Sequence, residues 1–282
     1  MTELSFLAVH AHPDDESITM GGTLARYAQE GIRTTLVTAT RGEVGEILDK
    51  DLDPQEAAPR LASIREGELR AACAILGVHE LVFLGYEDSG MMGEARNSVP
   101  GTFWQADQAE AVARLIAIIR RVRPQVVATY NEIGGYGHPD HINAHRVAVM
   151  AFYHADDIKL FPGGEPHRPS KLYYSAFPKS QVRAISQAMK RAGMEDRFAR
   201  DDGEAPFAVD DDRVTAQVDV SDQLQRKLDA MLAHRTQIPP DSWFMKLREV
   251  LGERAWSRES YERVRSRVEA PTPEDDLFAG LR

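Results

Sequence analysis

The stretch LSFLAVHAHPDDE, from Leu4 to Glu16, joins a short apolar segment directly to two imidazoles and three carboxylates. The apolar part, residues 4–9, has the length and composition of a buried β-strand, and Pro13 follows soon after it. In an open α/β sheet, ligands bind outside the carboxyl ends of the strands. The polar cluster that begins at His10 is therefore predicted to lie where such a fold carries out its chemistry.

A second polar cluster follows another apolar segment further along the chain. Residues 125–130 have strand character, and the sequence YGHPDH occupies positions 136–141. Either cluster alone would be interpreted as loop and helix-capping residues. Because His and Asp stand beside a proline at both predicted strand ends, we interpret the clusters as two halves of one metal site.

The pattern of apolar segments predicts the fold class. Segments with strand character alternate with helical patterns, which indicates βαβ units and a mostly parallel sheet. We expect an α/β, Rossmann-like sheet flanked by helices, in a single domain over residues 1–282. About 1–155 would form the core, and about 156–282 a C-terminal elaboration that completes the pocket. The predicted strands are 4–9, 34–39, 80–84, 125–130, 171–176 and 214–220, and the predicted helices lie near 19–30, 55–76, 105–122, 141–154 and 221–234, the last with Ser221 as its N-cap.

Composition and charge exclude several classes of protein. The chain has 282 residues, of which 43% are hydrophobic and 28% charged, as in soluble globular proteins. Its net charge of −10 argues against a nucleic-acid partner, because phosphates would be repelled. The single cysteine, Cys73, cannot form an intramolecular disulfide. With neither a leader pattern nor an apolar run long enough to cross a bilayer, the sequence predicts a cytoplasmic protein without a membrane partner.

The chemistry of the two clusters suits amide hydrolysis. That reaction needs an activated water, a polarised carbonyl and a protonated leaving amine, and zinc with three protein ligands is suited to the first two tasks. His12 and Asp15, three residues apart on a loop, can face one point, and His141 could supply a third ligand from the start of a helix. Asp14, between two ligands, would be free to take a proton from the attacking water.

Several motifs together resemble one family. AHPDDE at 11–16 and HPDH at 138–141 are similar to the PIG-L/LmbE-like zinc deacetylases, which remove acetyl from N-acetylglucosamine groups. TRGEVGE at 40–46 and GYEDSGM at 85–91 resemble two loops of that family. HRTQI at 234–238 and EDDLFAG at 274–280 resemble its thiol-sugar branch, which holds the mycothiol deacetylase and the mycothiol S-conjugate amidase.

The resemblance implies a role for each matching residue. Arg65 and Asp88 would hold sugar hydroxyls, although a solvated ion pair and a turn, respectively, are the structural alternatives. Glu16 would be structural and pair with a neighbouring imidazole or with backbone. The remaining implied roles are zinc ligands for His12, Asp15 and His141, general base for Asp14, acid or electrostatic stabiliser for His138, orientation of His138 for Asp140, and oxyanion stabilisation for Tyr136.

The predicted function is therefore a metal-dependent amide hydrolase that removes an acyl group, such as acetyl, from the amine of an N-acylated glucosamine in a small glycoside. One zinc ion per chain is expected, and Fe²⁺ could replace it in a reducing cell. The acyl group, the aglycone (inositol, malate or another) and homo-oligomerisation stay open. The alternatives are a thiol S-conjugate amidase acting on a cysteinyl-glucosamine, a dinuclear metal phosphoesterase that recruits Asp14 or Glu43, and a silent sugar-binding protein. A dinucleotide site is disfavoured, because Gly21-Gly22 lacks the rest of the fingerprint.

Overall fold

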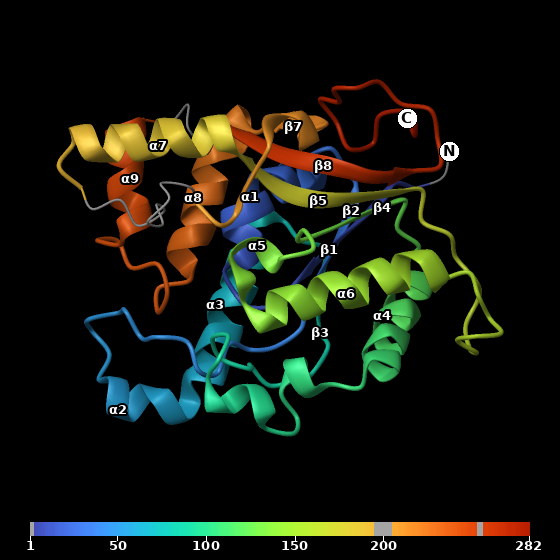
Figure 1. Ribbon diagram of the computed structural model, residues 1–282, viewed down its shortest axis with the longest axis horizontal. Helices are drawn as coiled ribbons and strands as arrows, with labels where there is room; N and C mark the ends of the chain where they lie inside the picture. Colours follow the sequence, from blue (N-terminus) through green and yellow to red (C-terminus); the bar gives the residue numbers. More distant parts are fainter. Residues whose placement is uncertain (1–2, 195–204, 253–255) are drawn as a thin grey trace.

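A mixed β-sheet forms the centre of the computed structural model, which describes residues 3–194, 205–252 and 256–282 (Figure 1). The strand order is β3-β2-β1-β4-β5-β8-β7, and β6 pairs with β5 outside this path. Strands β1 to β5 are parallel to their neighbours, whereas β8 is antiparallel to β5 and β7 is antiparallel to β8. The strands are β1 (Ser5–His10), β2 (Arg33–Thr38), β3 (Glu80–Phe83), β4 (Val126–Thr129), β5 (Lys171–Pro178), β6 (Ala208–Val209), β7 (Ala216–Asp219) and β8 (Arg258–Ser266).

The direction of winding reverses between β1 and β4. From β1 the chain proceeds outward through β2 to β3, while β4 on the other side of β1 is followed by β5. The register places Phe6 of β1 beside Thr34 of β2 and Val126 of β4. Such a reversal opens a crevice at the carboxyl ends of the two central strands, where ligands bind in this class of sheet. Both polar clusters of the sequence follow these two strands.

Helices cover both faces of the sheet (Figure 1). On one face Phe6 of β1 belongs to a buried cluster with Leu24, and helices α1, α3 and α8 pack together. On the other face Leu7 belongs to a second buried cluster with Leu115, and α4 packs on α6. The helices are α1 (Asp15–Gln29), α2 (Pro54–Ala57), α3 (Leu61–Leu76), α4 (Gln108–Val122), α5 (Gly134–Gly137), α6 (Pro139–His154), α7 (Lys179–Arg191), α8 (Leu224–Ala233) and α9 (Trp243–Leu251). None of the helices in the described ranges has the length and apolarity that a membrane span requires.

Helix α4 shows how the sequence specifies these layers. The side chain of Asp107 accepts a hydrogen bond from the backbone N–H of Glu110 and caps the first turn. Val112, Leu115 and Ile119 recur at a spacing of three and four residues and are all buried. One face of the helix is therefore apolar and packs on the sheet.

The C-terminal segment is fastened to the sheet through buried polar groups. The Glu274 carboxylate accepts hydrogen bonds of 2.5 Å from the ammonium of Lys171 and from the hydroxyl of Tyr173, both on β5. Leu277 and Phe278, which follow, are fully buried. The C-terminal elaboration therefore extends the central sheet and packs on it.

The structure confirms the predicted α/β class and its mostly parallel, helix-flanked sheet. The helix predicted near 55–76 is divided, because α2 and a 3₁₀ turn precede α3. Ser221 is not a helix N-cap: it opens a 3₁₀ turn, and its hydroxyl donates to Asp219 instead. Elements α5, α7, α9, β6 and β8 were not predicted.

Candidate metal centre

The loop after β1 holds a carboxylate and an imidazole in fixed positions. Asp15 Oδ2 accepts a hydrogen bond of 2.9 Å from the backbone N–H of His12 and one of 2.6 Å from the hydroxyl of Tyr130. Between them, Asp14 has a φ of 114°, a left-handed conformation that is strained for a residue with a side chain. Such strain persists where the surroundings enforce it, often at functional sites.

Three of the predicted residues present ligand atoms around one point. His12 Nδ1 lies 3.1 Å from His141 Nε2 and 3.6 Å from Asp15 Oδ2, and His141 Nε2 lies 3.4 Å from Asp15 Oδ1. Ligands of a tetrahedral ion at ~2.0–2.2 Å are separated by about 3.4 Å from one another. The spacing and the donor types therefore fit a divalent metal such as zinc.

The residues present offer further combinations of ligands. Ligand atoms of His12, His138 and His141 lie within 4.8 Å of one another, as do those of His12, Asp88, His138 and Asp140. Both acidic residues of the second set face His12 Nε2, with Asp140 Oδ2 at 3.1 Å and Asp88 Oδ1 at 3.7 Å. One imidazole cannot direct both its nitrogens at a single ion, so the side of Nδ1 and the side of Nε2 are alternative positions.

Hydrogen bonds to the outer nitrogens of the rings favour the Nδ1 side. His12 Nε2 faces the carboxylate of Asp140, and His141 is hydrogen-bonded to the backbone of Gly134. Metal-binding histidines usually donate their second N–H to a carboxylate or carbonyl, which fixes the ring. Gly134 has a φ of +62°, and a Cβ there would lie 2.7 Å from His141 Cβ, so only glycine allows this approach.

The Asp140 carboxylate faces His12 rather than the ring that the sequence associates with it. Its two oxygens contact His12 Nε2, the backbone N–H of Ser89 at 2.9 Å and the Ser89 hydroxyl. Only the backbone N–H of Asp140 reaches His138, where it donates to Nδ1 at 3.1 Å. The geometry favours His12 over His138 as the ring that this carboxylate orients.

Asp14 lies beside a buried guanidinium. Arg65, 3% exposed, donates to the carbonyl of Pro13 at 2.5 Å and to that of Gly42 at 2.9 Å, and its Nη2 is 3.3 Å from Asp14 Oδ2. Arg65 is therefore not the solvated surface residue of the alternative interpretation. Burial raises the pKa of Asp14 to about 7, although the positive charge of Arg65 acts in the opposite direction. A carboxylate with such a pKa suits general-base chemistry near neutral pH.

His138 and Tyr136 border the same point from the loop after β4. The His138 ring centroid lies 4.5 Å from that of His12, and the Tyr136 ring centroid lies 5.0 Å from that of His141. Burial, followed by the nearby imidazoles of His12 and His141, lowers the pKa of His138 to about 3. Tyr136 is 46% exposed and lies in a glycine-rich turn, so its phenol is at the edge of the site.

The loops after β2 and β3 close another side of the site. Asp88 is 4% exposed, and its Oδ1 accepts a hydrogen bond of 2.8 Å from the backbone N–H of Gly90. Its own backbone N–H donates to Glu43 Oε2 at 3.0 Å, which joins the two loops. Gly42 has a φ of +65°, and a Cβ there would collide with the Arg65 guanidinium. These loops therefore hold Asp88 and Arg65 near Asp14 and His12.

Behind the site, Glu16 forms a buried ion pair with His234, a partner that the sequence alone does not identify. Glu16 Oε1 lies 2.7 Å from Nε2 of His234, which follows α8, and both side chains are inaccessible to solvent. Glu16 Oε2 also accepts from the backbone N–H of Asp14 at 3.1 Å. Pairing of Glu16 with an imidazole and with backbone confirms its predicted structural part. The pattern of one sequence cannot show that the imidazole comes from 218 residues further along the chain.

The sequence of this chain is similar to a known family and to known proteins. Residues 7–152 match the family described as GlcNAc-PI de-N-acetylase, PIG-L. The chain is 48% identical over 285 residues to the 1D-myo-inositol 2-acetamido-2-deoxy-alpha-D-glucopyranoside deacetylase of Geodermatophilus obscurus. That alignment covers 98% of this chain and 97% of the relative.

The fold of this chain is similar to those of solved structures. N,N'-diacetylchitobiose deacetylase from Pyrococcus horikoshii is similar with a TM-score of 0.64 and 21% identity, over 93% of this chain and 84% of that one. The 4-carboxy-2-hydroxymuconate hydratase of Pseudomonas putida also has a TM-score of 0.64, with 20% identity, over 95% and 99% of the two chains. Because a hydratase shares the architecture with a deacetylase, the fold alone does not fix the reaction.

Proposed function

Because the chain belongs to the PIG-L family, we propose that it is the deacetylase of an N-acetylglucosaminyl inositol, the compound named for its relative at 48% identity. The enzyme is a metal-dependent deacetylase that hydrolyses an amide bond. The 48% identity to that relative carries the choice of glycoside, and the residue roles rest on Asp14 beside a set of His and Asp ligand atoms at the carboxyl ends of β1 and β4. The glycoside and the residue roles below belong to this proposal.

We assign the metal position to His12 Nδ1, Asp15 and His141 Nε2, and we propose zinc as the ion. The distances of 3.1–3.6 Å between these atoms suit a bound ion, and the partners of the outer ring nitrogens, Asp140 for His12 and Gly134 for His141, support this choice over the set on the Nε2 side. A bound divalent ion would supply Lewis acidity, which polarises a carbonyl and eases the deprotonation of water.

The chain's own residues would carry the proton. The Asp14 carboxylate accepts a proton from the water that attacks the amide carbon, and its raised pKa makes this transfer favourable near neutral pH. In this proposal, His138 and the Tyr136 hydroxyl donate hydrogen bonds to the developing oxyanion. When the C–N bond breaks, the proton held by Asp14 is available to the leaving amine, so acetate and the free glucosamine amine are the products.

A screen with the metal-loaded enzyme tests the proposed function. N-acetylglucosamine, its inositol glycoside and its malate glycoside are compared, with amine release as the readout. The inositol glycoside is expected to have the highest kcat/KM. Equal or higher kcat/KM for the malate glycoside would contradict the assignment of the aglycone.

Replacement of Asp88 by alanine should reduce kcat/KM for the sugar amide by about 10- to 150-fold. A carboxylate can accept two hydroxyl hydrogen bonds, and bonds to a charged group contribute ~1.5–3 kcal/mol. The same change should scarcely affect hydrolysis of N-ethylacetamide, which has no sugar. Equal losses with both substrates would show that Asp88 serves the fold or the metal site instead.

Replacement of Asp140 by asparagine should weaken metal binding by about 10- to 100-fold, the usual effect of removing an outer-shell partner of a metal-binding histidine. The amide keeps the shape of the carboxylate but loses the charge that faces His12 Nε2. Competition with a chelator measures the metal Kd. An unchanged metal Kd with reduced turnover would instead support the interpretation that Asp140 orients His138.

A further inference from the structure

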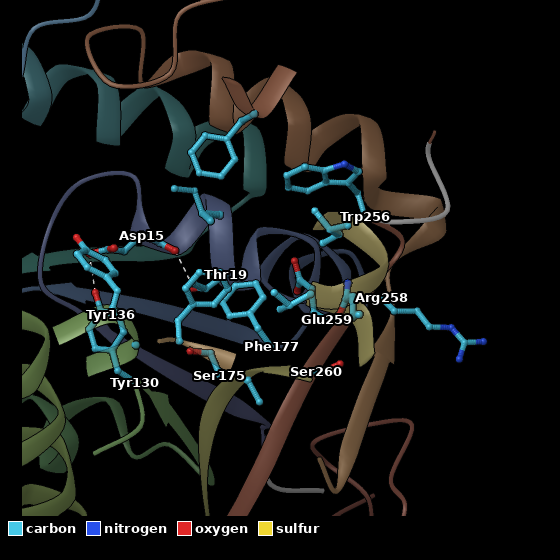
Figure 2. A pocket seen from close by; sticks show the side chains of 18 of the residues that line it. Asp15, Thr19, Tyr130, Tyr136, Ser175, Phe177, Trp256, Arg258, Glu259 and Ser260 are labelled. Atoms are coloured by element: carbon cyan, nitrogen blue, oxygen red, sulfur yellow. Dashed lines mark hydrogen bonds between the residues drawn. The ribbon is translucent and has the colours of Figure 1, made fainter. Parts of the chain in front are cut away.

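An apolar cavity of about 260 Å³ begins at the metal centre, and its lining includes no residue of the loops after β2 and β3 that carry Gly42 and Asp88. Asp15, His141, Tyr130 and Tyr136 line its inner end. Figure 2 shows Asp15, Tyr130 and Tyr136 at one end of the cavity, Trp256 and Glu259 at the other, and Phe177 between them. The reacting centre therefore opens into a space that none of the proposed roles uses.

The lining of the cavity has the chemistry of a site for an apolar group. Between the metal end and the ion pair of Lys227 with Glu259, most of the lining is aliphatic and aromatic, and the polar residues Thr19, Ser175 and Gln181 also contribute to it. The apolar lining residues come from α1, α7, α9 and the segments around β5, β6 and β8, and they are Ile18, Ala176, Phe177, Val182, Ile185, Phe207, Trp243, Phe244, Leu247, Leu251 and Trp256. Small-molecule sites are concave and mostly apolar, with a small number of polar groups that fix the orientation of the ligand.

The direction of the cavity indicates which part of the substrate it receives. Arg65 and Asp88, the candidate sugar contacts, do not belong to its lining and lie on the side of Asp14 and His12 Nε2. An amide carries its sugar on nitrogen and its acyl group on the carbonyl carbon. If the sugar occupies the Arg65 side, the acyl carbon chain points past Asp15 and His141 into the cavity.

We propose that this cavity is an acyl subsite, and that the enzyme hydrolyses glucosamine amides of medium-length apolar acyl groups as well as acetyl. The inference rests on the proposed function, because it uses the same metal centre and the same sugar-side contacts. The reaction is otherwise unchanged: water adds its oxygen to the acyl carbon, the C–N bond breaks, and a fatty acid and the free amine leave.

The test is an acyl series on one sugar. The metal-loaded enzyme is assayed with the acetyl, butanoyl and hexanoyl amides of the same glucosaminyl inositol, with amine release as the readout. Burial of each methylene is worth about 0.8 kcal/mol, or about fourfold in kcat/KM. Hexanoyl has four more methylenes than acetyl, so we expect a rise in kcat/KM of up to about 250-fold from acetyl to hexanoyl. Flat or falling kcat/KM values, with acetyl hydrolysed, would overturn the acyl subsite and leave the proposed function intact.

Two matched variants on α7 connect this preference to the cavity. Ile185 lines the cavity, whereas its neighbour Ala184 is exposed and does not line it. Ile185→Trp should lower the hexanoyl-to-acetyl ratio of kcat/KM by at least about tenfold, while Ala184→Trp should leave the ratio unchanged. A ratio that is the same in both variants and in the unsubstituted enzyme would contradict the assignment to this cavity.

A binding measurement on the unsubstituted enzyme does not depend on the folding of a variant. Trp243 and Trp256 line the cavity, so hexanoate should change the intrinsic tryptophan fluorescence at concentrations at which acetate does not. Identical titrations with the two acids would count against the proposal. An octyl glycoside of N-acetylglucosamine tests whether the cavity receives the aglycone instead. A higher kcat/KM for this apolar aglycone, without a rise in kcat/KM along the acyl series, would overturn the acyl assignment. Hydrolysis of none of the amides would overturn both proposals.

Discussion

Replacement of His141 by alanine should remove the bound metal and lower kcat/KM by at least about 10³-fold. His141 Nε2 lies 3.1 Å from His12 Nδ1 and 3.4 Å from Asp15, so its loss leaves two ligands where three are needed. Loss of Lewis acidity removes several kcal/mol of stabilisation from the transition state, and each ~1.4 kcal/mol is a factor of ten in rate. Metal analysis of the purified protein and kinetic assay of the same sample check both parts.

His138→Ala is the matched control for this prediction. The His138 ring belongs to both further ligand combinations, whereas the assigned position does not use it, so the two variants distinguish the assigned position from these alternatives. We expect His138→Ala to retain full metal content. The reverse result, full metal in His141→Ala and loss in His138→Ala, would move the metal to the Nε2 side of His12.

Replacement of Asp14 by asparagine should retain the metal and lower kcat by about 10²–10⁴-fold, the usual contribution of a general base. The amide has nearly the same shape as the carboxylate and can remain beside Arg65, but it cannot accept a proton. Kinetic assay must be accompanied by metal analysis, because Asp14 adjoins the proposed ligand Asp15.

The variant Arg65→Lys is the control for a structural effect of the Asp14 substitution on this loop. Arg65 donates to Pro13 and Gly42 as well as facing Asp14, so Arg65→Lys disturbs the same loop without removing the carboxylate. We expect Arg65→Lys to lose less activity than Asp14→Asn. Near-normal turnover of metal-loaded Asp14→Asn would exclude Asp14 as the base.

The parallel half of the fold could be predicted because its strands are apolar and its turns are marked. Residues 4–9 and 125–130 stand out as strands, and the polar clusters that follow them lie at the same edge of the sheet, as expected for a doubly wound order. The family and the deacetylase class are confirmed. The roles of the individual site residues and the extent of a single domain over residues 1–282 stay predictions.

Strand β8 was not predicted because its stability comes from distant partners rather than from a local apolar pattern. Strand β8, RESYERVRS, is rich in charge, and Glu259 is buried because it accepts hydrogen bonds from Gly22, Thr23 and Lys227. Helix α7 has only Val182 and Met189 buried among its 13 residues. The charged pattern of β8 does not indicate a core strand when it is read alone, whereas Val182, Ile185 and Met189 of α7 have the three- and four-residue spacing of an apolar helix face, a signal that could have predicted this helix.

The two sides of the site come from separate parts of the chain. Gly42, Arg65 and Asp88 belong to the first 90 residues, whereas the apolar walls of the cavity are formed mainly after residue 175. Asp15 and His141, which line the cavity, belong to the metal centre between the two groups. On the proposed assignments, changes in the later part could therefore alter the tolerated acid while the recognised amine is preserved. On these assignments, the specificity for the released acid and the specificity for the released amine can evolve independently while the hydrolytic reaction stays the same.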